Sequence, residues 1–187
     1  NGREHLCTKR IILGMNKPIE RQGCFAELVL TPDKNIYELP SNLDIKQAPI
    51  AEPTAVALHA VELGEEVLKK PIDQSRVLVI GGGAIGLLCA LILEKYKKCK
   101  EIVLVDPNER RLKVCGDHLN SETLKPDNIT IKDSSFDMVF DTVGLEITRQ
   151  NSIKSVNPGG VIIHIGLTQP SGTFNFRKAT LQEITFV

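Results

Sequence analysis

The sequence predicts an α/β protein built around a doubly wound parallel sheet. Four short runs of β-branched and other apolar residues indicate strands, at residues 77–80, 102–105, 137–140 and 161–165. Because these runs do not alternate with polar residues, they are typical of strands covered on both faces. Helical or loop segments separate them, which favours right-handed parallel crossovers.

The first 50 residues have a different pattern from the rest of the chain. Pro and Gly separate three short strand candidates, at residues 10–13, 24–30 and 35–39. The second of these partly alternates, as a half-buried antiparallel strand would. From Glu52 the pattern becomes helical, with Pro53 near the first turn and an apolar stripe behind it. We therefore divide the chain into two domains, residues 1–50 and residues 51–187.

One segment does not fit a regular strand–helix alternation. Between Gly116 and Phe136 the chain is polar and too short for a full strand, helix and return. We expect a strand near residues 129–131 and a shortened crossover in this segment.

Composition restricts the partners and the location. Lys and Arg number 23, as do Asp and Glu, so no overall field favours nucleic acid or an anionic membrane. The apolar run at residues 84–93 is too short to cross a bilayer. Five widely spaced cysteines without a C-x-x-C pair favour reduced thiols and a cytoplasmic protein. The chain lacks an initiator Met and ends in a strand-like segment, so we expect it to be a fragment.

A glycine motif indicates the chemistry. Gly81, Gly83 and Gly86 form G-x-G-x-x-G directly after a predicted buried strand and at the start of a predicted helix. The first glycine allows a tight turn, the second a close approach to a pyrophosphate, and the third close packing of helix and strand. Asp106 ends the next strand, 20 residues beyond Gly86, as expected of the acid that binds the adenosine ribose. The alternative is glycines that serve packing alone, but the agreement of strand, glycines, helix and acid favours a dinucleotide site.

The acid also indicates which dinucleotide binds. A carboxylate at Asp106 would repel the 2′-phosphate of NADP, which favours NAD. Arg110 and Arg111 follow closely and weaken this argument; Arg111 either covers the adenine or faces solvent. At the end of the strand 161–165, backbone groups of Ile165, Gly166 and Leu167, with those of residues 143–144, are candidates for holding the nicotinamide end. The alternative is that Gly166 only ends the strand.

Taken together, these motifs resemble the zinc-dependent medium-chain dehydrogenases, the group of alcohol, sorbitol and threonine dehydrogenases. The resemblance covers nearly the whole chain, and its segments are residues 1–7, 23–40, 51–60, 77–86, 103–112, 136–144 and 157–167. It implies a Rossmann nucleotide-binding domain at residues 51–187. It also implies that residues 1–50 are part of a β-rich, GroES-like catalytic domain, including the end of a structural-zinc lobe.

The resemblance implies roles for single residues as well. Cys7 matches the last of four cysteines that hold a structural zinc. Glu52 matches an acid that lies at the catalytic zinc as a ligand or near neighbour. The positions that match cofactor contacts are Ile85, Asp106, Arg111, Ile165, Gly166 and Leu167. The other ligands of both zinc ions would precede this chain.

These roles imply an oxidoreductase that transfers a hydride between NAD and a secondary alcohol or polyol, or its ketone. Its cofactors would be NAD and zinc, and the intact protein would be a homo-oligomer, a dimer or tetramer. The 187 residues alone are expected to be inactive. Two alternatives remain open: a zinc-free reductase of the same superfamily, and a non-catalytic NAD-binding module, which the shortened crossover would favour.

Overall fold

The computed structural model describes residues 3–15, 21–126 and 133–187. The chain divides into two compact units, Asn1–Ile45 and Lys46–Val187. Within its described residues the first unit contains two short 3-10 helices, η1 (Glu4–Leu6) and η2 (Asp33–Asn35), and otherwise only turns and irregular backbone.

The prediction of strands in the first unit is wrong. Residues 10–13, 24–30 and 35–39 all lie in the described part of the chain, and none of them forms a strand there. A strand needs a neighbour to pair its backbone groups. The large apolar side chains of the second candidate are also solvent-exposed: Phe25, Leu28 and Leu30 have relative exposures of 108%, 92% and 94%. The alternating apolar pattern therefore did not lead to a strand, because a strand also needs a neighbouring strand with which to form backbone hydrogen bonds.

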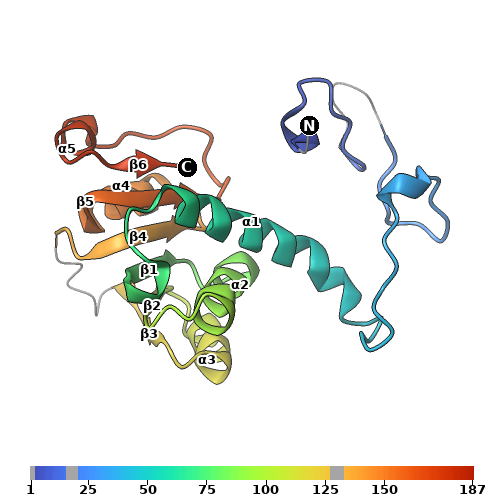
Figure 1. Cartoon of the computed structure of the whole chain (residues 1–187), viewed down its shortest axis with the longest axis horizontal. Coiled ribbons are helices and arrows are strands. Elements are labelled where there is room, and N and C mark those ends of the chain that lie inside the picture. The colour runs from blue at the N-terminus through green and yellow to red at the C-terminus, as the bar shows by residue number, and fades with distance from the viewer. Residues whose placement is uncertain (1–2, 16–20, 127–132) are drawn as a thin grey trace. The chain divides into compact units, whose positions relative to one another are not determined.

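The second unit is built on a six-stranded parallel sheet with the order β3-β2-β1-β4-β5-β6. In Figure 1 the strand labels follow this order from bottom to top. The strands are β1 (Arg76–Ile80), β2 (Glu101–Val105), β3 (Glu122–Leu124), β4 (Phe136–Asp141), β5 (Val156–His164) and β6 (Thr185–Phe186). The predicted doubly wound α/β class and its four core strands are confirmed. The strand order reverses between β1 and β4, which makes this the topological switch point.

The polar segment after α3 (Glu109–His118) contains a strand at an unpredicted position. The strand that pairs with β2 is β3, and its residues are exposed or only partly buried. Its three residues, Glu-Thr-Leu, carry little of the apolar signal that identified the other strands. The expected strand near residues 129–131 lies outside the described residues.

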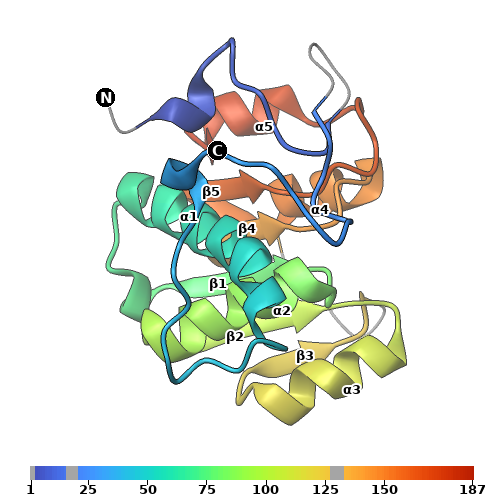
Figure 2. The ribbon, with the colours of Figure 1, turned by 90° about the vertical axis from the view of Figure 1, so that its right-hand side faces the viewer.

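Helices cover both faces of the sheet, as Figures 1 and 2 show. One core lies between the sheet and α1 (Ala51–Val67), α2 (Ala84–Leu91) and α3, and contains Val77 and Val79 of β1. The other lies beneath α4 (Glu146–Ser155) and α5 (Phe176–Leu181), and contains Leu78 and Ile80. Successive side chains of one strand point to opposite faces, so a strand between two helical layers must be apolar at every position. Within the described residues, no helix is long and apolar enough to cross a membrane.

At the amino-terminal edge of the sheet, Asp137 joins three segments of the chain. Its Oδ2 accepts hydrogen bonds from Lys70 Nζ (2.7 Å) and from the N–H of Arg76 (2.9 Å). Its Oδ1 accepts one from Asn157 Nδ2 (3.0 Å). Burial alone would raise the pKa of Asp137, but the hydrogen bonds from Lys70, Arg76 and Asn157 outweigh it and hold the pKa below its usual value. The ionised carboxylate is therefore part of what holds the start of β1 against β4 and β5.

We predict that Asp137→Ala lowers the free energy of unfolding by about 1 to 3 kcal/mol at pH 7, because three donors lose a charged acceptor. A depressed folded pKa contributes stability above the unfolded value, near 3.8, and this contribution is lost as the pH falls through the folded pKa. The difference from the wild type should therefore shrink below about pH 4. Urea unfolding followed by far-UV circular dichroism at several pH values measures both effects.

Glu101→Ala is the matched control for this experiment. Glu101 is the partner of Arg76 at 3.7 Å, but its side chain is 70% exposed, so its loss should change stability by less than about 1 kcal/mol. Equal effects of the two variants would contradict the role of Asp137, as would a difference that persists undiminished in acid.

Candidate dinucleotide-binding site

The turns that follow β1, β2, β4 and β5 lie along the same edge of the sheet, because these strands are parallel and adjacent. Ligands of doubly wound sheets bind outside the carboxyl ends of the strands, at the switch point. The turn residues in question are 81–83 after β1, Asp106 after β2, 142–145 after β4 and 165–167 after β5. Of the residues predicted to contact a cofactor, this edge holds Gly81, Gly83, Asp106 and residues 165–167. Ile85 and Gly86 follow in the first turn of α2, and Arg111 lies in the first turn of α3.

The three motif glycines are required for different reasons. A Cβ built on Gly86 would lie 1.8 Å from the carbonyl oxygen of Gly81, so α2 could not start where it does with any other residue. Gly81 has φ +106°, and a Cβ there would lie 2.6 Å from Oγ1 of Thr142. At Gly83, by contrast, no described atom outside its two chain neighbours lies within 4 Å of a built Cβ. The turn is therefore open on the side of Gly83 that a side chain would occupy.

This open space lies at the N-terminus of α2. Gly83 is the N-cap residue, and no side chain of the described residues caps this helix. The contrast is α3, where the side chain of Asn108 accepts hydrogen bonds from the N–H groups of Arg110 (2.9 Å) and Arg111 (3.3 Å). The first N–H groups of α2 and the positive end of its dipole are thus available to an anion such as a pyrophosphate.

Asp106 is directly connected to the glycine turn. It is buried, with 2% relative exposure. Its Oδ2 accepts a hydrogen bond from the N–H of Gly82 (2.8 Å), and its Oδ1 accepts one from the N–H of Asn108 (2.7 Å). Arg111 places Nη1 3.4 Å from Oδ2. A carboxylate offers about four lone-pair positions, so these contacts leave it capacity for a hydroxyl donor.

A second buried carboxylate, Asp141, shapes the turn after β4. Its Oδ1 accepts hydrogen bonds from the N–H groups of Val143 (3.0 Å) and Gly144 (2.9 Å), and its Oδ2 accepts one from Thr148 Oγ1 (3.1 Å). His164 Nδ1 lies 3.7 Å from the same Oδ2. Burial would raise the pKa of Asp141, but His164, the two N–H groups and the Thr148 hydroxyl hold it below its usual value.

The turns after β4 and β5 touch through their backbones. The N–H groups of Ile165 and Gly166 donate to the carbonyl oxygen of Asp141, at 2.9 and 3.0 Å. A Cβ on Gly166 would lie 2.1 Å from the carbonyl carbon of Val143, and one on Gly144 would lie 2.1 Å from the carbonyl oxygen of Gly166. Gly166 is therefore needed for this close approach and does more than end a strand. Leu167, next in the chain, is 92% exposed.

Sequence reasoning missed several residues of this edge. Thr142 donates from Oγ1 to the carbonyl oxygen of Ile80 (2.8 Å) and fills the space beside Gly81. Gly82 presents its N–H to Asp106, and Asp141 organises the turn after β4. The available signal was position: a polar residue directly after a buried strand lies at the carboxyl edge of a parallel sheet.

The two residues matched to zinc ligands belong to other segments of the chain. Cys7 is exposed in the first unit, and Glu52 is exposed in the first turn of α1. Across residues 3–15, 21–126 and 133–187, no group of three or more His, Cys, Asp and Glu side chains is placed to hold a metal ion. Tetrahedral zinc takes three or four protein ligands, so the described residues do not fit a complete zinc site.

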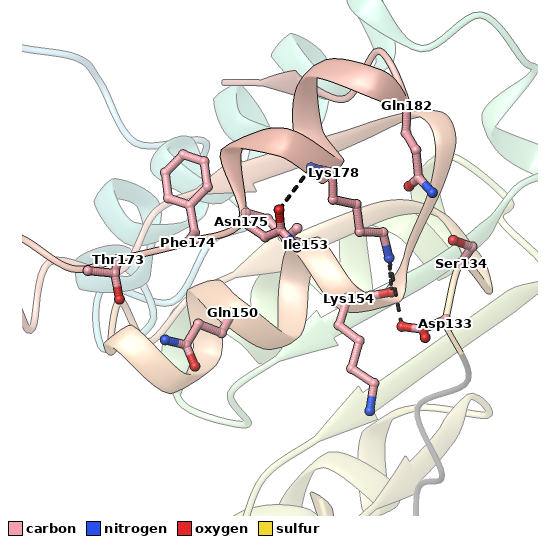
Figure 3. Close-up of a pocket in the computed structure, with 10 residues that line it drawn as sticks. All are labelled: Asp133, Ser134, Gln150, Ile153, Lys154, Thr173, Phe174, Asn175, Lys178 and Gln182. Atoms are coloured by element: carbon pink, nitrogen blue, oxygen red, sulfur yellow. Dashed lines mark hydrogen bonds and ion pairs between the residues drawn. The ribbon is translucent and has the colours of Figure 1, made fainter.

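A pocket of about 620 Å³ lies elsewhere, on the side of the sheet covered by α4 and α5 (Figure 3). None of the described residues that line it belongs to the glycine turn, to Asp106 or to the turn after β5. Lys178, which Figure 3 shows directed toward Lys154 and Asp133, donates to the Lys154 carbonyl oxygen (2.8 Å) and lies 3.7 Å from Asp133 Oδ1. The positive charge of Lys178 is thus already paired with groups of the protein. The lining residues show that this pocket is separate from the candidate site.

A doubly wound sheet of this strand order, with a glycine turn after its first strand and an acid after its second, defines the class of dinucleotide-binding α/β domains. Within that class, residues 45–186 match the family described as the glucose dehydrogenase C-terminus, and the chain belongs to this family.

Individual relatives agree with this assignment. An L-threonine 3-dehydrogenase from Proteus mirabilis is 31% identical over 89% of this chain and 48% of its own length. The protein named probable D-xylulose reductase A from Neosartorya fischeri is 25% identical over 99% of this chain and 52% of its own length. A solved structure assigned as a zinc-binding dehydrogenase from Sinorhizobium meliloti, bound to NADP, has a TM-score of 0.82 at 25% identity, covering 99% of this chain and 55% of that one. The chain thus spans about half the length of the curated relatives it matches.

The glycine geometry predicts that substitution by Ala destabilises the fold much more at Gly86 than at Gly83. Gly86→Ala should lower the free energy of unfolding by about 1 to 3 kcal/mol, because its methyl group would overlap the Gly81 carbonyl. Gly83→Ala should change it by less than about 1 kcal/mol, because its methyl group enters open space at an N-cap. Parallel urea denaturation of the two variants tests this, and equal losses would show that the turn is not packed as described.

Proposed function

We propose that this chain is the NAD-binding part of a zinc-dependent oxidoreductase that transfers a hydride between NAD and a secondary alcohol or polyol, or its ketone. The observation that carries the proposal is the open, uncapped N-terminus of α2 at Gly83, beside the link from Gly82 to Asp106. Membership of the glucose dehydrogenase family and the names of the relatives support the reaction and the substrate class.

In this proposal each part of the edge binds one part of the cofactor. The turn from Gly81 to Gly86, including Ile85, takes the pyrophosphate on the N–H groups of α2. Asp106 accepts the adenosine ribose hydroxyls, and Arg111 covers the adenine. Backbone groups of Ile165, Gly166 and Leu167 hold the nicotinamide end. When bound, NAD supplies the hydride acceptor, and these residues fix its position relative to the substrate.

Asp106 supports NAD over NADP, because its buried carboxylate would face the 2′-phosphate. Arg111, whose Nη1 lies 3.4 Å from Asp106 Oδ2, favours NADP instead, because its positive charge would attract the 2′-phosphate. One structural relative was solved with NADP. We propose NAD because Asp106 contacts the glycine turn directly, whereas the Arg111 side chain is 59% exposed.

The remaining assignments concern the intact protein. We propose that residues 1–50 belong to a catalytic domain and residues 51–187 to the nucleotide-binding domain. Cys7 and Glu52 would contribute to a structural and a catalytic zinc site only together with ligands beyond the described residues. We also propose a cytoplasmic homo-oligomer with no nucleic-acid or membrane partner; five free cysteines and balanced charge support this.

Gly83→Val tests the pyrophosphate position. The side chain would fill the open space at the N-terminus of α2, so NAD affinity should fall at least about tenfold while the fold remains. Isothermal titration calorimetry measures the affinity. Gly116→Val is the matched control, because a Cβ there meets Thr123 Oγ1 at an ordinary 3.7 Å, far along α3 from its start. Normal NAD binding by Gly83→Val would refute the proposed site.

Asp106→Asn tests the ribose acid. NAD binding should weaken by about 1 to 3 kcal/mol through loss of a charged acceptor. Binding of NADP should weaken less or improve, because the repulsion is removed and Arg111 is released. The ratio of the two dissociation constants is the informative quantity, since the variant also loses an acceptor for the N–H of Gly82 or Asn108 and this loosening affects both cofactors. An unchanged ratio would exclude Asp106 as the ribose acid.

A further inference from the structure

The loop that follows β5 is fastened to the first turn of α4 by the side chain of Gln169. Its Oε1 accepts a hydrogen bond from the N–H of Glu146 at 2.6 Å. Its backbone N–H donates to the carbonyl oxygen of Gly144 at 3.0 Å. Residue 146 is the first of α4, so Gln169 satisfies a donor that the helix itself cannot pair.

Two side chains of α4 complete the attachment. Arg149 Nη2 donates to the carbonyl oxygen of Gln169 at 2.6 Å. Glu146 Oε1 accepts hydrogen bonds from the hydroxyl and from the N–H of Thr173, the latter at 3.4 Å. Thr168, between these anchors and the turn, donates from Oγ1 to the carbonyl oxygen of Val143 at 2.6 Å. Residues 168–173 are thus held at both ends against the start of α4.

The attachment continues into the interior of the sheet edge. Thr148, in the same helical turn, accepts from the N–H of Leu145 (3.0 Å) and donates to the buried Asp141. The carbonyl oxygen of Asp141 in turn receives the N–H groups of Ile165 and Gly166. The short segment from Ile165 to Leu167 is therefore bounded by Asp141 on one side and by Gln169 on the other.

The N-termini of α2 and α4 consequently differ in what pairs their first N–H groups. At α4 the leading N–H group is paired by Gln169, whereas at α2 no described side chain pairs the corresponding groups. An anion would be drawn to α2, and the start of α4 is used to hold a loop.

We propose that Gln169 and Arg149 are positioning residues for the nicotinamide end of the cofactor site, acting through residues 165–167. The inference rests on the proposed function, because it takes the segment after β5 as the part that meets the nicotinamide. Gln169 is exposed, so its side chain contributes little to the core. Its removal should release the loop and leave the rest of the site as it is.

Two ligands separate the two halves of the site. ADP-ribose carries the adenosine, pyrophosphate and second ribose of NAD but lacks the nicotinamide. Gln169→Leu removes the acceptor and leaves an uncharged side chain that is one atom shorter. We expect it to weaken NAD binding about fivefold, the effect of one lost hydrogen bond, and to leave ADP-ribose binding within about twofold of wild type. Arg149→Met should give the same selective loss. Gln169→Glu keeps an acceptor oxygen and should retain wild-type NAD binding.

Gln74→Leu is the matched control. Gln74 is also an exposed glutamine, but it lies in η4 (Ile72–Gln74), directly before β1 at the amino-terminal edge of the sheet and away from the loop after β5. This control variant should change neither the affinity for NAD nor the affinity for ADP-ribose. Wild-type NAD affinity in Gln169→Leu would overturn the positioning role, and so would an equal loss of NAD and ADP-ribose binding, which would indicate general loosening. If the wild-type chain bound neither ligand, the proposed function itself would fail, an outcome distinct from the first two.

Discussion

The candidate site depends on one steric constraint, the contact of Gly86 with the carbonyl oxygen of Gly81. A Cβ at Gly86 would lie 1.8 Å from that oxygen, so the helix can fold back on the turn only with glycine there. This contact sets where α2 begins and therefore where its unpaired N–H groups point. The same turn presents the N–H of Gly82 to Asp106 on β2 and packs Gly81 against Thr142 after β4. The glycine turn after β1 thus contacts residues that follow both neighbouring strands, β2 and β4.

The edge is assembled by pairing almost every polar group that the turns expose. Buried donors and acceptors are costly unless they are hydrogen-bonded. Asp106 pairs the N–H groups after β1 and β2, Asp141 pairs those after β4, and Gln169 pairs the start of α4. At the start of α2, by contrast, no described side chain pairs the first N–H groups, and this is why we propose that a pyrophosphate binds there.

The sequence was informative where a local pattern determines the structure. The strands β1, β2, β4 and β5 could be predicted because burial on both faces forces continuous apolar runs. The short β3 could not, because its side chains are partly exposed and its position depends on pairing with β2. The strand candidates in the first 50 residues had the right residue types, but a strand also needs a partner, which sequence periodicity does not report. Likewise, the position of Asp106 at the end of β2 could be predicted from spacing, whereas the contact of Gln169 with Glu146 depends on a loop meeting a helix that starts 23 residues earlier.

A comparison of the two buried aspartates explains why an acid at a strand end is an ambiguous signal. Both make the same local turn: Asp106 accepts from the N–H of Asn108 and Asp141 from that of Val143, each two residues on. Such a carboxylate stabilises its own turn whether or not a ligand binds. The second oxygen makes the difference, because that of Asp141 is turned toward Thr148 and the interior, and that of Asp106 toward Gly82 in the glycine turn. An aspartate after a parallel strand therefore does not by itself indicate a ribose site. Asp106 differs from Asp141 because its Oδ2 contacts the glycine turn, and this contact is why we propose Asp106 as the ribose acid.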